Sequence, residues 1–224
     1  RDFISNVSHE LRTPVSVIRA NSETLVDGAL DNKKQAKVFA KAILHNAERL
    51  SDMVSSLLDL SRIDYGELKL NIEELPINEN INKAIDSLKN LGKRKNISIM
   101  CSCSKGKIVL ADKNALERIL NNLIENAFKY SDSESTIYIS TRKVKDHLEI
   151  SVKDSGRGIP DEEQDFLFDR FYRTAEARAT EEKGSGLGLA IVKNLVNNLN
   201  GEVGVKNAEP HGSTFWFTLP LKTS

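Results

Sequence analysis

Hydrophobic positions divide the chain into two parts with different periodicities. In residues 1–63 the seam positions advance by alternating steps of three and four, the spacing of helices packed along a heptad seam. The first run comprises Ile4, Val7, Leu11, Pro14, Ile18, Asn21 and Leu25, and the second comprises Ile43, Ala47, Leu50, Val54 and Leu57. Residues 26–33 (VDGALDNK) separate them with turn and helix-cap residues. The pattern predicts a hairpin of two helices, each of about 25 to 30 residues.

Both apolar stripes are wider than one partner helix can cover. Leu44, Leu58 and Leu60 extend the second stripe beyond its seam. Because two helices bury little by themselves, we expect two chains to form a four-helix bundle, which makes the protein a homodimer. The alternative is that the hairpin packs on the second part of the chain.

From Tyr65 onward, short strand patterns alternate with helical ones. The expected strands are residues 68–75, 97–102, 107–111, 136–142, 147–153, 202–207 and 213–219, and the expected helices are about 78–93, 113–128, 162–170 and 187–199. This order predicts a sheet with helices layered on one face. The fold class is therefore α + α/β, with a helical hairpin in residues 1–64 and an α/β sandwich in residues 68–224, joined by a hinge at 64–67.

Composition narrows the classes of function. Lys plus Arg and Asp plus Glu both number 32, so the chain lacks the basic field of a general nucleic-acid binder. No apolar run in these 224 residues is long enough to span a membrane, and we expect none of them to belong to a signal peptide. The first residue is Arg and the periodicity has begun by Ile4, so we expect a fragment of a longer protein whose upstream segment holds any sensor and membrane span. Cys101 and Cys103 are expected to be buried free thiols in a reducing compartment.

The stretch NVSHELRTP (6–14) places a histidine on the exposed side of the first helix. With Val7 on the seam, His9 faces about 200° away from it, and Thr13 lies within about 40° of His9. A neutral imidazole can act as a nucleophile. Pro14 removes the N–H that would bond the carbonyl of Glu10, which loosens the turn after the histidine. Taken alone, this geometry fits an ordinary surface histidine as well.

Five motifs in order change that interpretation. FISNVSHELRTP (3–14) resembles the phosphoacceptor box of sensor histidine kinases of the HisKA type. The family's asparagine, first glycine, phenylalanine and second glycine boxes are similar to NNLIENAFKYS (121–131), DSGRGIP (154–160), FDRFYR (168–173) and GSGLGLAI (184–191). The resemblance covers nearly the whole chain and implies autophosphorylation of His9 from Mg·ATP, followed by transfer to an aspartate in the receiver domain of a response regulator.

The resemblance also assigns roles to single residues. Glu10 would accept the proton of the imidazole, and Thr13 would serve in dephosphorylating the regulator. Asn122 and Asn126 share one side of a predicted helix, and their amide oxygens suit Mg²⁺. The resemblance gives Asn126 the metal and Asn122 an assisting role, and it places Lys129 and Tyr130 near the phosphates. Asp154 would accept a hydrogen bond from the adenine amine, beside Gly156 and Gly158, which allow close backbone approach.

The second glycine box differs from a P-loop because it contains no G-K-[ST] sequence. Its residues Gly184, Gly186, Leu187 and Gly188 are expected to close a lid at 174–185 and to begin a helix whose N-terminus favours phosphate. Arg173 at the root of the lid is a candidate phosphate contact. Phe168 and Phe171 are expected to be apolar anchors of the lid.

One substitution points to a kinase and not a hydrolase. Gyrase-type and heat-shock-chaperone-type ATPases carry a water-activating glutamate four residues before the magnesium asparagine, where this chain has Asn122. Two other classes of function are alternatives: a non-enzymatic dimeric scaffold, which the intact motifs disfavour, and a protein serine or anti-sigma kinase, a class that lacks the SHELRTP helix. His45, His147 and His211 are expected to be structural or solvated. The fragment is expected to be cytoplasmic, within a full-length protein of the cell (inner) membrane.

Overall fold

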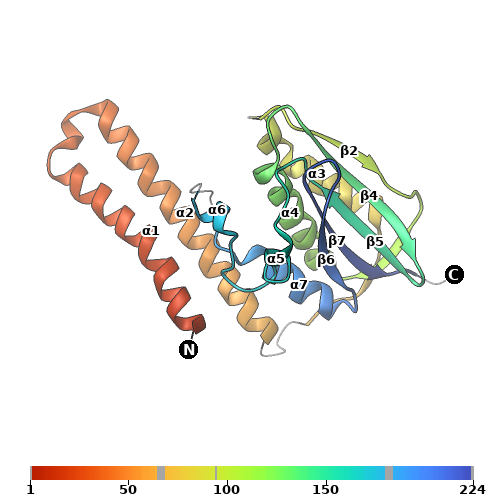
Figure 1. The fold of residues 1–224 in the computed structure, drawn as a ribbon. Coiled ribbons are helices and arrows are strands. Elements are labelled where there is room, and N and C mark those ends of the chain that lie inside the picture. The colour runs from red at the N-terminus through yellow and green to blue at the C-terminus, as the bar shows by residue number, and fades with distance from the viewer. Residues whose placement is uncertain (1, 65–68, 94, 180–183, 223–224) are drawn as a thin grey trace.

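The computed structural model describes residues 2–64, 69–93, 95–179 and 184–222. The predicted hairpin is confirmed: α1 (Asp2–Val26) and α2 (Lys33–Asp64) lie side by side and are joined through the 3-10 turn η1 (Ala29–Asp31) (Figure 1). The side chain of Asn32 caps α2 by accepting from the N–H groups of Lys34 and Gln35. Pro14 is buried inside α1, which continues through it. Of the predicted hinge, Asp64 is the last residue of α2, and residues 65–67 lie outside the described ranges.

The second part of the chain contains two sheets. The strands are β1 (Glu73–Pro76), β2 (Ser98–Ser102), β3 (Ile108–Ala111), β4 (Thr136–Val144), β5 (His147–Lys153), β6 (Val203–Asn207) and β7 (Ser213–Pro220). The larger sheet has the order β2-β4-β5-β7-β6, in which β2 and β4 are parallel and the other neighbours are antiparallel. The strands β1 and β3 form a separate antiparallel pair.

Helices cover one face of the larger sheet, as the sequence predicts (Figure 1). They are α3 (Ile77–Lys93), α4 (Lys113–Tyr130) and α7 (Gly188–Asn198), with the short α5 (Asp161–Gln164) and α6 (Ala175–Ala179) between sheet and hairpin. Alternate residues of β5, namely Leu148, Ile150 and Val152, are buried. They share a core with residues of α4 such as Leu116 and Leu123, so the helix layer holds α4 firmly beside the sheet.

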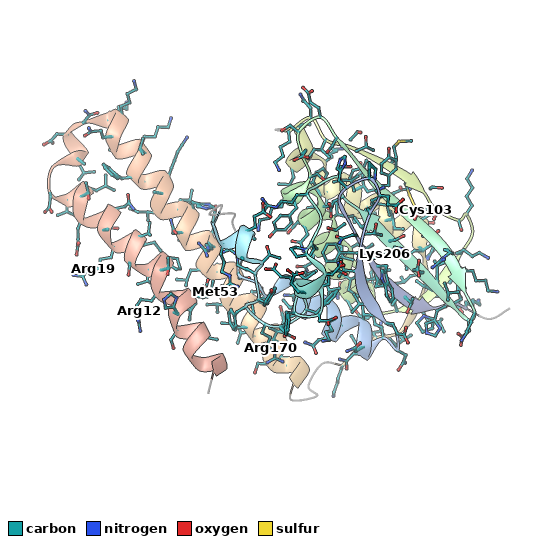
Figure 2. The ribbon with its side chains drawn as sticks, in the orientation of Figure 1. Arg12, Arg19, Met53, Cys103, Arg170 and Lys206 are labelled. Carbon is teal, nitrogen blue, oxygen red and sulfur yellow. A yellow bond between two sulfur atoms is a disulfide. The ribbon has the colours of Figure 1, made fainter. Side chains whose placement is uncertain are left out.

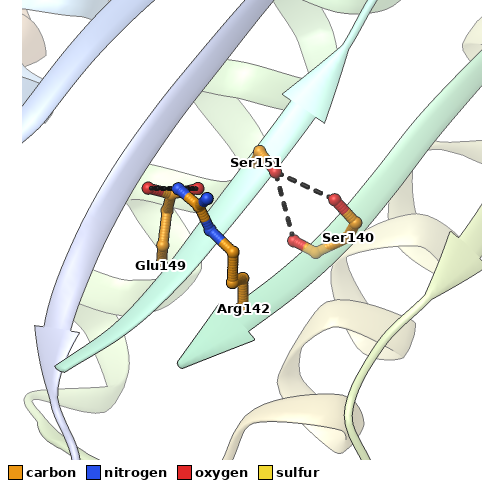
Figure 3. A network of polar contacts seen from close by, with 4 residues as sticks. All are labelled: Ser140, Arg142, Glu149 and Ser151. Atoms are coloured by element: carbon orange, nitrogen blue, oxygen red, sulfur yellow. Dashed lines mark hydrogen bonds and ion pairs between the residues drawn. The ribbon is translucent and has the colours of Figure 1, made fainter. Parts of the chain in front are cut away.

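Polar pairs occupy the opposite face of the sheet. Across β4 and β5, Ser140 Oγ lies 2.9 Å from Ser151 Oγ, and Arg142 Nη2 donates to both carboxylate oxygens of Glu149 at 2.9 Å (Figure 3). Cross-strand pairs of this kind are typical of a sheet whose second face meets solvent.

The hairpin also packs on the second part of the chain, through the C-terminal half of α2. Met53 and Leu60 are buried in the same core as the helices of the sheet layer, and α2 packs against α7. Asp59 forms an ion pair with Arg118 on α4. Elsewhere on α2 the apolar stripe stays uncovered within this chain: Leu44 is 60% exposed and Leu58 is 56% exposed.

Two expected elements are shorter than predicted. Regular strand structure begins at Glu73 and not at residue 68, which lies outside the described residues. The helix expected at 162–170 ends at Gln164, and the chain continues in turns such as Asp169 N–H to Phe166 O at 2.9 Å. Phe171 then adopts a φ of 63° and donates its N–H to the carbonyl of Gly186 at 2.9 Å, a contact that a continuing helix would prevent.

The prediction of free thiols is wrong. Cys101 and Cys103 form a disulfide, with their Cα atoms 5.6 Å apart. A C-x-C pair in an extended segment places both sulfurs on one face, and this separation is within the range that a disulfide can span. Cys103 lies on the sheet side of the molecule, far from the hairpin (Figure 2). None of the helices that the structure describes combines the length and the hydropathy of a membrane span.

Candidate active site

A cavity of about 550 Å³ lies between α2, α4, α7 and the loops that follow β5. The structure brings most of the predicted site residues to its wall: Asn122, Asn126, Lys129, Tyr130, Asp154, Gly156, Gly158, Arg173, Gly184, Gly186 and Gly188. Leu187 is different, because its side chain is fully buried in the core. Motifs that are far apart in the sequence therefore meet around one space large enough for a nucleotide.

Asp154 is held at the end of β5 by backbone donors. Its Oδ1 accepts from Gly156 N–H at 2.9 Å and from Ser213 N–H at 3.0 Å, while the residue is buried. Burial raises the pKa of this carboxyl, and the hydrogen bonds from Gly156 and Ser213 partly oppose that shift. A fixed acceptor on the cavity wall, in little water, can recognise an exocyclic amine such as that of adenine.

The asparagines of α4 face the start of α7. Asn122 Nδ2 donates to the carbonyl of Arg118 at 2.8 Å, which orients its oxygen towards Gly188. A Cβ on Gly188 would lie only 2.5 Å from Asn122 Oδ1, so the glycine allows this close approach without a shift of the asparagine side chain. Asn126 lies one turn further along α4 and also lines the cavity. An amide oxygen on this wall fits Mg²⁺, which keeps waters and takes further ligands from phosphate.

The two glycine boxes allow close backbone contacts. A Cβ on Gly156 would lie 2.4 Å from the carbonyl oxygen of Tyr130, at the end of α4. Gly186, at a φ of 70°, lies against the backbone of Phe171, where a Cβ would come within 2.7 Å. Lys129 Nζ lies 4.6 Å from the ring centroid of Tyr130 and donates to its hydroxyl at 2.9 Å. Cationic and phenolic groups are thus gathered where α4 ends.

The described part of the lid is ordered against the cavity. Residues 175–179 form α6, an element that the sequence pattern did not predict, and residues 180–183 lie outside the described ranges. Arg157 of the first glycine box forms an ion pair with Glu176 of α6 at 2.6 Å. Arg173 donates to the carbonyl of Ala177. Phe168 is buried and makes an edge contact with Phe215, as expected for an apolar anchor.

The residues of the predicted phosphoacceptor box lie on α1, away from the cavity wall. His9 is exposed, as the helical periodicity predicts. Thr13 is also exposed, and its hydroxyl donates to the carbonyl of His9 across a long 3.4 Å. Glu10 is half-buried, and its Oε2 lies 3.7 Å from Arg49 Nη2 on α2. The acid beside the histidine is therefore linked to the second helix of the hairpin.

Sequence reasoning missed the contribution of α2 to the cavity. His45, Glu48, Arg49, Asp52 and Met53 all line it, although only tertiary docking brings them there. Opposite them on α4, Glu125 has its pKa raised by burial and by the nearby charge of Asp52. His45 thus has a place in the site that the sequence did not indicate.

The remaining histidines lie elsewhere. His147 Nδ1 lies 2.8 Å from Asp146 Oδ1 and its Nε2 lies 2.9 Å from the carbonyl of Asn200, and the hydrogen bond to the Asp146 carboxylate is the main cause of its raised pKa. His211 is exposed in the turn before β7. Both placements agree with a structural or solvated role.

Comparisons with known proteins point to one family. Residues 1–66 match the model of the His Kinase A (phospho-acceptor) domain. Residues 111–223 match the model of the histidine kinase-, DNA gyrase B- and HSP90-like ATPases. The sensor-like histidine kinase SenX3 of Mycobacterium bovis is 38% identical over 220 residues, which cover 98% of this chain and 53% of that protein. The chain thus spans about half the length of this curated relative.

Solved structures of histidine kinases have a similar fold. Histidine kinase AdeS of Acinetobacter baumannii superposes with a TM-score of 0.80 at 26% identity, covering 96% of this chain and 98% of that one. Full-length ShkA in complex with AMPPNP superposes with a TM-score of 0.73 at 25% identity, covering 100% of this chain and 46% of that one.

Proposed function

Because this chain belongs to the sensor histidine kinase family, we propose that it phosphorylates its own His9 from Mg·ATP and passes the phosphoryl group to a response regulator. One observation carries the proposal. A single chain joins an exposed histidine on a helical hairpin to a nucleotide-sized cavity that has Asn122 where a hydrolase needs a base. Such a cavity holds ATP for a nucleophile that is brought to it.

Each wall of the cavity has a part in holding the nucleotide. Asp154 accepts from the adenine amine, and the glycines let the backbone approach the ligand. Lys129, Arg173 and the N-terminus of α7 are the positive groups for the phosphates. Asn126 is the metal ligand, with Asn122 beside it. Mg²⁺, when bound, neutralises charge on the phosphates during transfer.

The chemistry consists of two phosphoryl transfers. A ring nitrogen of His9 forms a bond to the γ-phosphorus while the bond from that phosphorus to the ADP oxygen breaks. Glu10 accepts the imidazole proton, a general-base contribution of roughly 10²–10⁴ in rate. In the second transfer, the N–P bond breaks as an aspartate oxygen of the receiver domain bonds to phosphorus.

His9 reaches a γ-phosphate only after a rearrangement, because it is not on the cavity wall of its own chain. The ATP-binding part moves relative to the hairpin, or the cavity of a second chain meets His9. Either route suits a homodimer held through the uncovered apolar stripe of the hairpin.

The proposal also includes attachment of the whole protein to a membrane. A second activity, dephosphorylation of the regulator, is favoured by the exposed Thr13 hydroxyl one turn beyond His9.

The test is to incubate the chain with ATP labelled in the γ-phosphate and Mg²⁺. We expect a protein-bound label that survives alkali and is lost in acid, as a phosphoramidate is. His9→Gln should abolish it, and His211→Gln, a change at an exposed turn, should leave it intact. Label that is stable in acid, or that persists in His9→Gln, would refute the proposal.

A further inference from the structure

Arg49 connects the phosphoacceptor helix to the nucleotide cavity. Its Nη2 lies 3.7 Å from Glu10 Oε2 on α1, and the same side chain lines the cavity. Glu10 is the neighbour of His9 in sequence and the proposed base. Arg49 is therefore placed to contact the base on one side and a bound ligand on the other.

The position of Arg49 follows from how α2 is docked. Met53, one turn further along α2 (Figure 2), is 1% exposed, and Leu60 is fully buried in the common core. The ion pair of Asp59 with Arg118 fixes α2 against α4. Since residues four apart share one side of a helix, the side of α2 that packs on the core also directs Arg49 to the cavity.

One donor of Arg49 is left over by the described part of the fold. Its Nε is buried and has no hydrogen-bond partner among the described residues. The contact with Glu10 is an ion pair that is longer than a hydrogen bond. Buried donors are normally satisfied, so the unpartnered Nε of a partly exposed guanidinium beside a ligand cavity leaves room for a further acceptor. Its planar set of donors suits a phosphate group.

The charges around Arg49 also favour a phosphate group as its acceptor. The other ionisable groups that α2 places on the wall are His45, Glu48 and Asp52, and α4 adds Glu125 beside them and Lys129 at its C-terminal end. Arg49 is the only Lys or Arg among the described residues of α2 that line the cavity. A triphosphate that approaches this side therefore meets carboxylates unless Arg49 receives it.

We propose that Arg49 is a positioning residue for which Glu10 and the terminal phosphate of the nucleotide compete. When Mg·ATP enters, the guanidinium exchanges Glu10 for the γ-phosphate, and the freed carboxylate turns to the imidazole of His9. Nucleotide binding thereby prepares the base. The inference rests on the proposed kinase function and adds a residue on α2 to its site.

If Glu10 and the terminal phosphate compete for Arg49, substitutions at Glu10 should change the affinity for the nucleotide. Removing the charge of Glu10 frees Arg49 for phosphate, so Glu10→Gln should tighten Mg·AMPPNP binding by about fivefold or more, the lower end of measured couplings between sites. Arg49→Ala should weaken it, and should also abolish the gain from Glu10→Gln. Mg·ADP, which lacks the terminal phosphate, should show no such coupling.

Calorimetry on the wild type, the two single variants and the double variant measures this coupling for both nucleotides. Arg49→Lys keeps the charge and loses the planar set of donors, so it should retain a weaker coupling. Arg19→Ala removes a comparable Arg–Glu pair on α1, at a side chain that is 79% exposed and away from the cavity (Figure 2), and should change neither affinity. Equal effects of Glu10→Gln with and without Arg49, or equal coupling for AMPPNP and ADP, would overturn the proposal.

The binding experiment and the labelling of His9 test the role of Arg49 and the kinase function separately. If the wild type labels His9 but no coupling is found, the role of Arg49 alone fails. If the coupling is present and His9 is never labelled, the function fails and the competition for Arg49 stands. A structural role for Arg49 would lower stability without making ATP binding respond to Glu10, and thermal unfolding of the four chains distinguishes that case.

Discussion

Asn126 and Asp154 line the same cavity and are expected to hold different groups of the nucleotide. Asn126→Ala removes the metal ligand, so labelling of His9 should be lost and Mg²⁺ should no longer strengthen ATP binding, with an effect of at least roughly 10–100-fold. Asp154→Ala removes the adenine acceptor, so nucleotide binding should weaken whether or not Mg²⁺ is present. Calorimetry with and without Mg²⁺ separates the two.

A neighbouring asparagine provides the control for this pair. Asn121 lies on the same helix but not on the cavity wall, so Asn121→Ala should preserve both binding and labelling. Normal Mg·ATP binding and labelling in Asn126→Ala would show that the metal role belongs to another residue.

Thr13 should act in removing phosphate from the regulator. Its hydroxyl is exposed and its bond to the carbonyl of His9 is long, so it can instead orient a water for attack on a docked phospho-aspartate. Thr13→Ala should slow decay of the phosphorylated regulator on the order of 10²-fold, the cost of a misplaced reactant. Autophosphorylation and forward transfer should change little.

The helix offers a matched control in Thr24, whose hydroxyl makes the same type of bond to Ala20 O at 2.8 Å. Thr24→Ala should leave decay of the regulator unchanged. Equal decay with wild type and Thr13→Ala, both faster than the regulator alone, would remove Thr13 from the reaction.

At the scale of elements, Lys95 holds the end of the helix that carries the asparagine box. Its Nζ donates to the carbonyls of Phe128, Lys129 and Ser131 at 3.4, 2.7 and 2.9 Å, which caps the C-terminus of α4. Lys95→Ala should lower the free energy of unfolding by about 1.5–3 kcal/mol, the contribution of hydrogen bonds to a charged group. Denaturation followed by fluorescence of Trp216, the one tryptophan of the chain, measures the loss.

Lys89 on α3 provides the comparison, because it is exposed and forms a surface ion pair with Asp86 at 3.5 Å. Lys89→Ala should change stability by less than about 0.5 kcal/mol, as is usual for surface substitutions. Similar losses for both variants would mean that Lys95 has no capping role.

The elements also show which features a sequence can predict. The hairpin, the strands and the helix layer were predictable because each has its own apolar period, as in the alternation along β5. The helix expected at 162–170 was predicted wrongly because Phe171 pairs with the distant Gly186, which no local pattern records. The site residues of the motifs were predictable because each motif is a continuous run of residues in the sequence. The positions of Arg49 and His45 on the cavity wall were not predictable, since they depend on how α2 packs against the rest of the chain.

At the scale of the whole molecule, the uncovered stripe of α2 should be closed by a second chain. Leu58 is 56% exposed in one chain, so Leu58→Asp should cost the monomer little and place an unpaired charge in the dimer, at several kcal/mol. Sedimentation should show a monomer. Leu91→Asp, at a similarly exposed leucine on α3, should remain dimeric. A dimeric Leu58→Asp would exclude this stripe as the interface.

Of the four histidines, His9 alone is expected to receive phosphate. Mass spectrometry of peptides from the chain, after incubation with Mg·ATP and digestion at alkaline pH, tests this expectation. We expect a phosphoryl group on His9, its absence in the Asn126→Ala chain, and unmodified His45, His147 and His211. Phosphate on another histidine, or none on His9 in a chain that binds Mg·ATP, would contradict it.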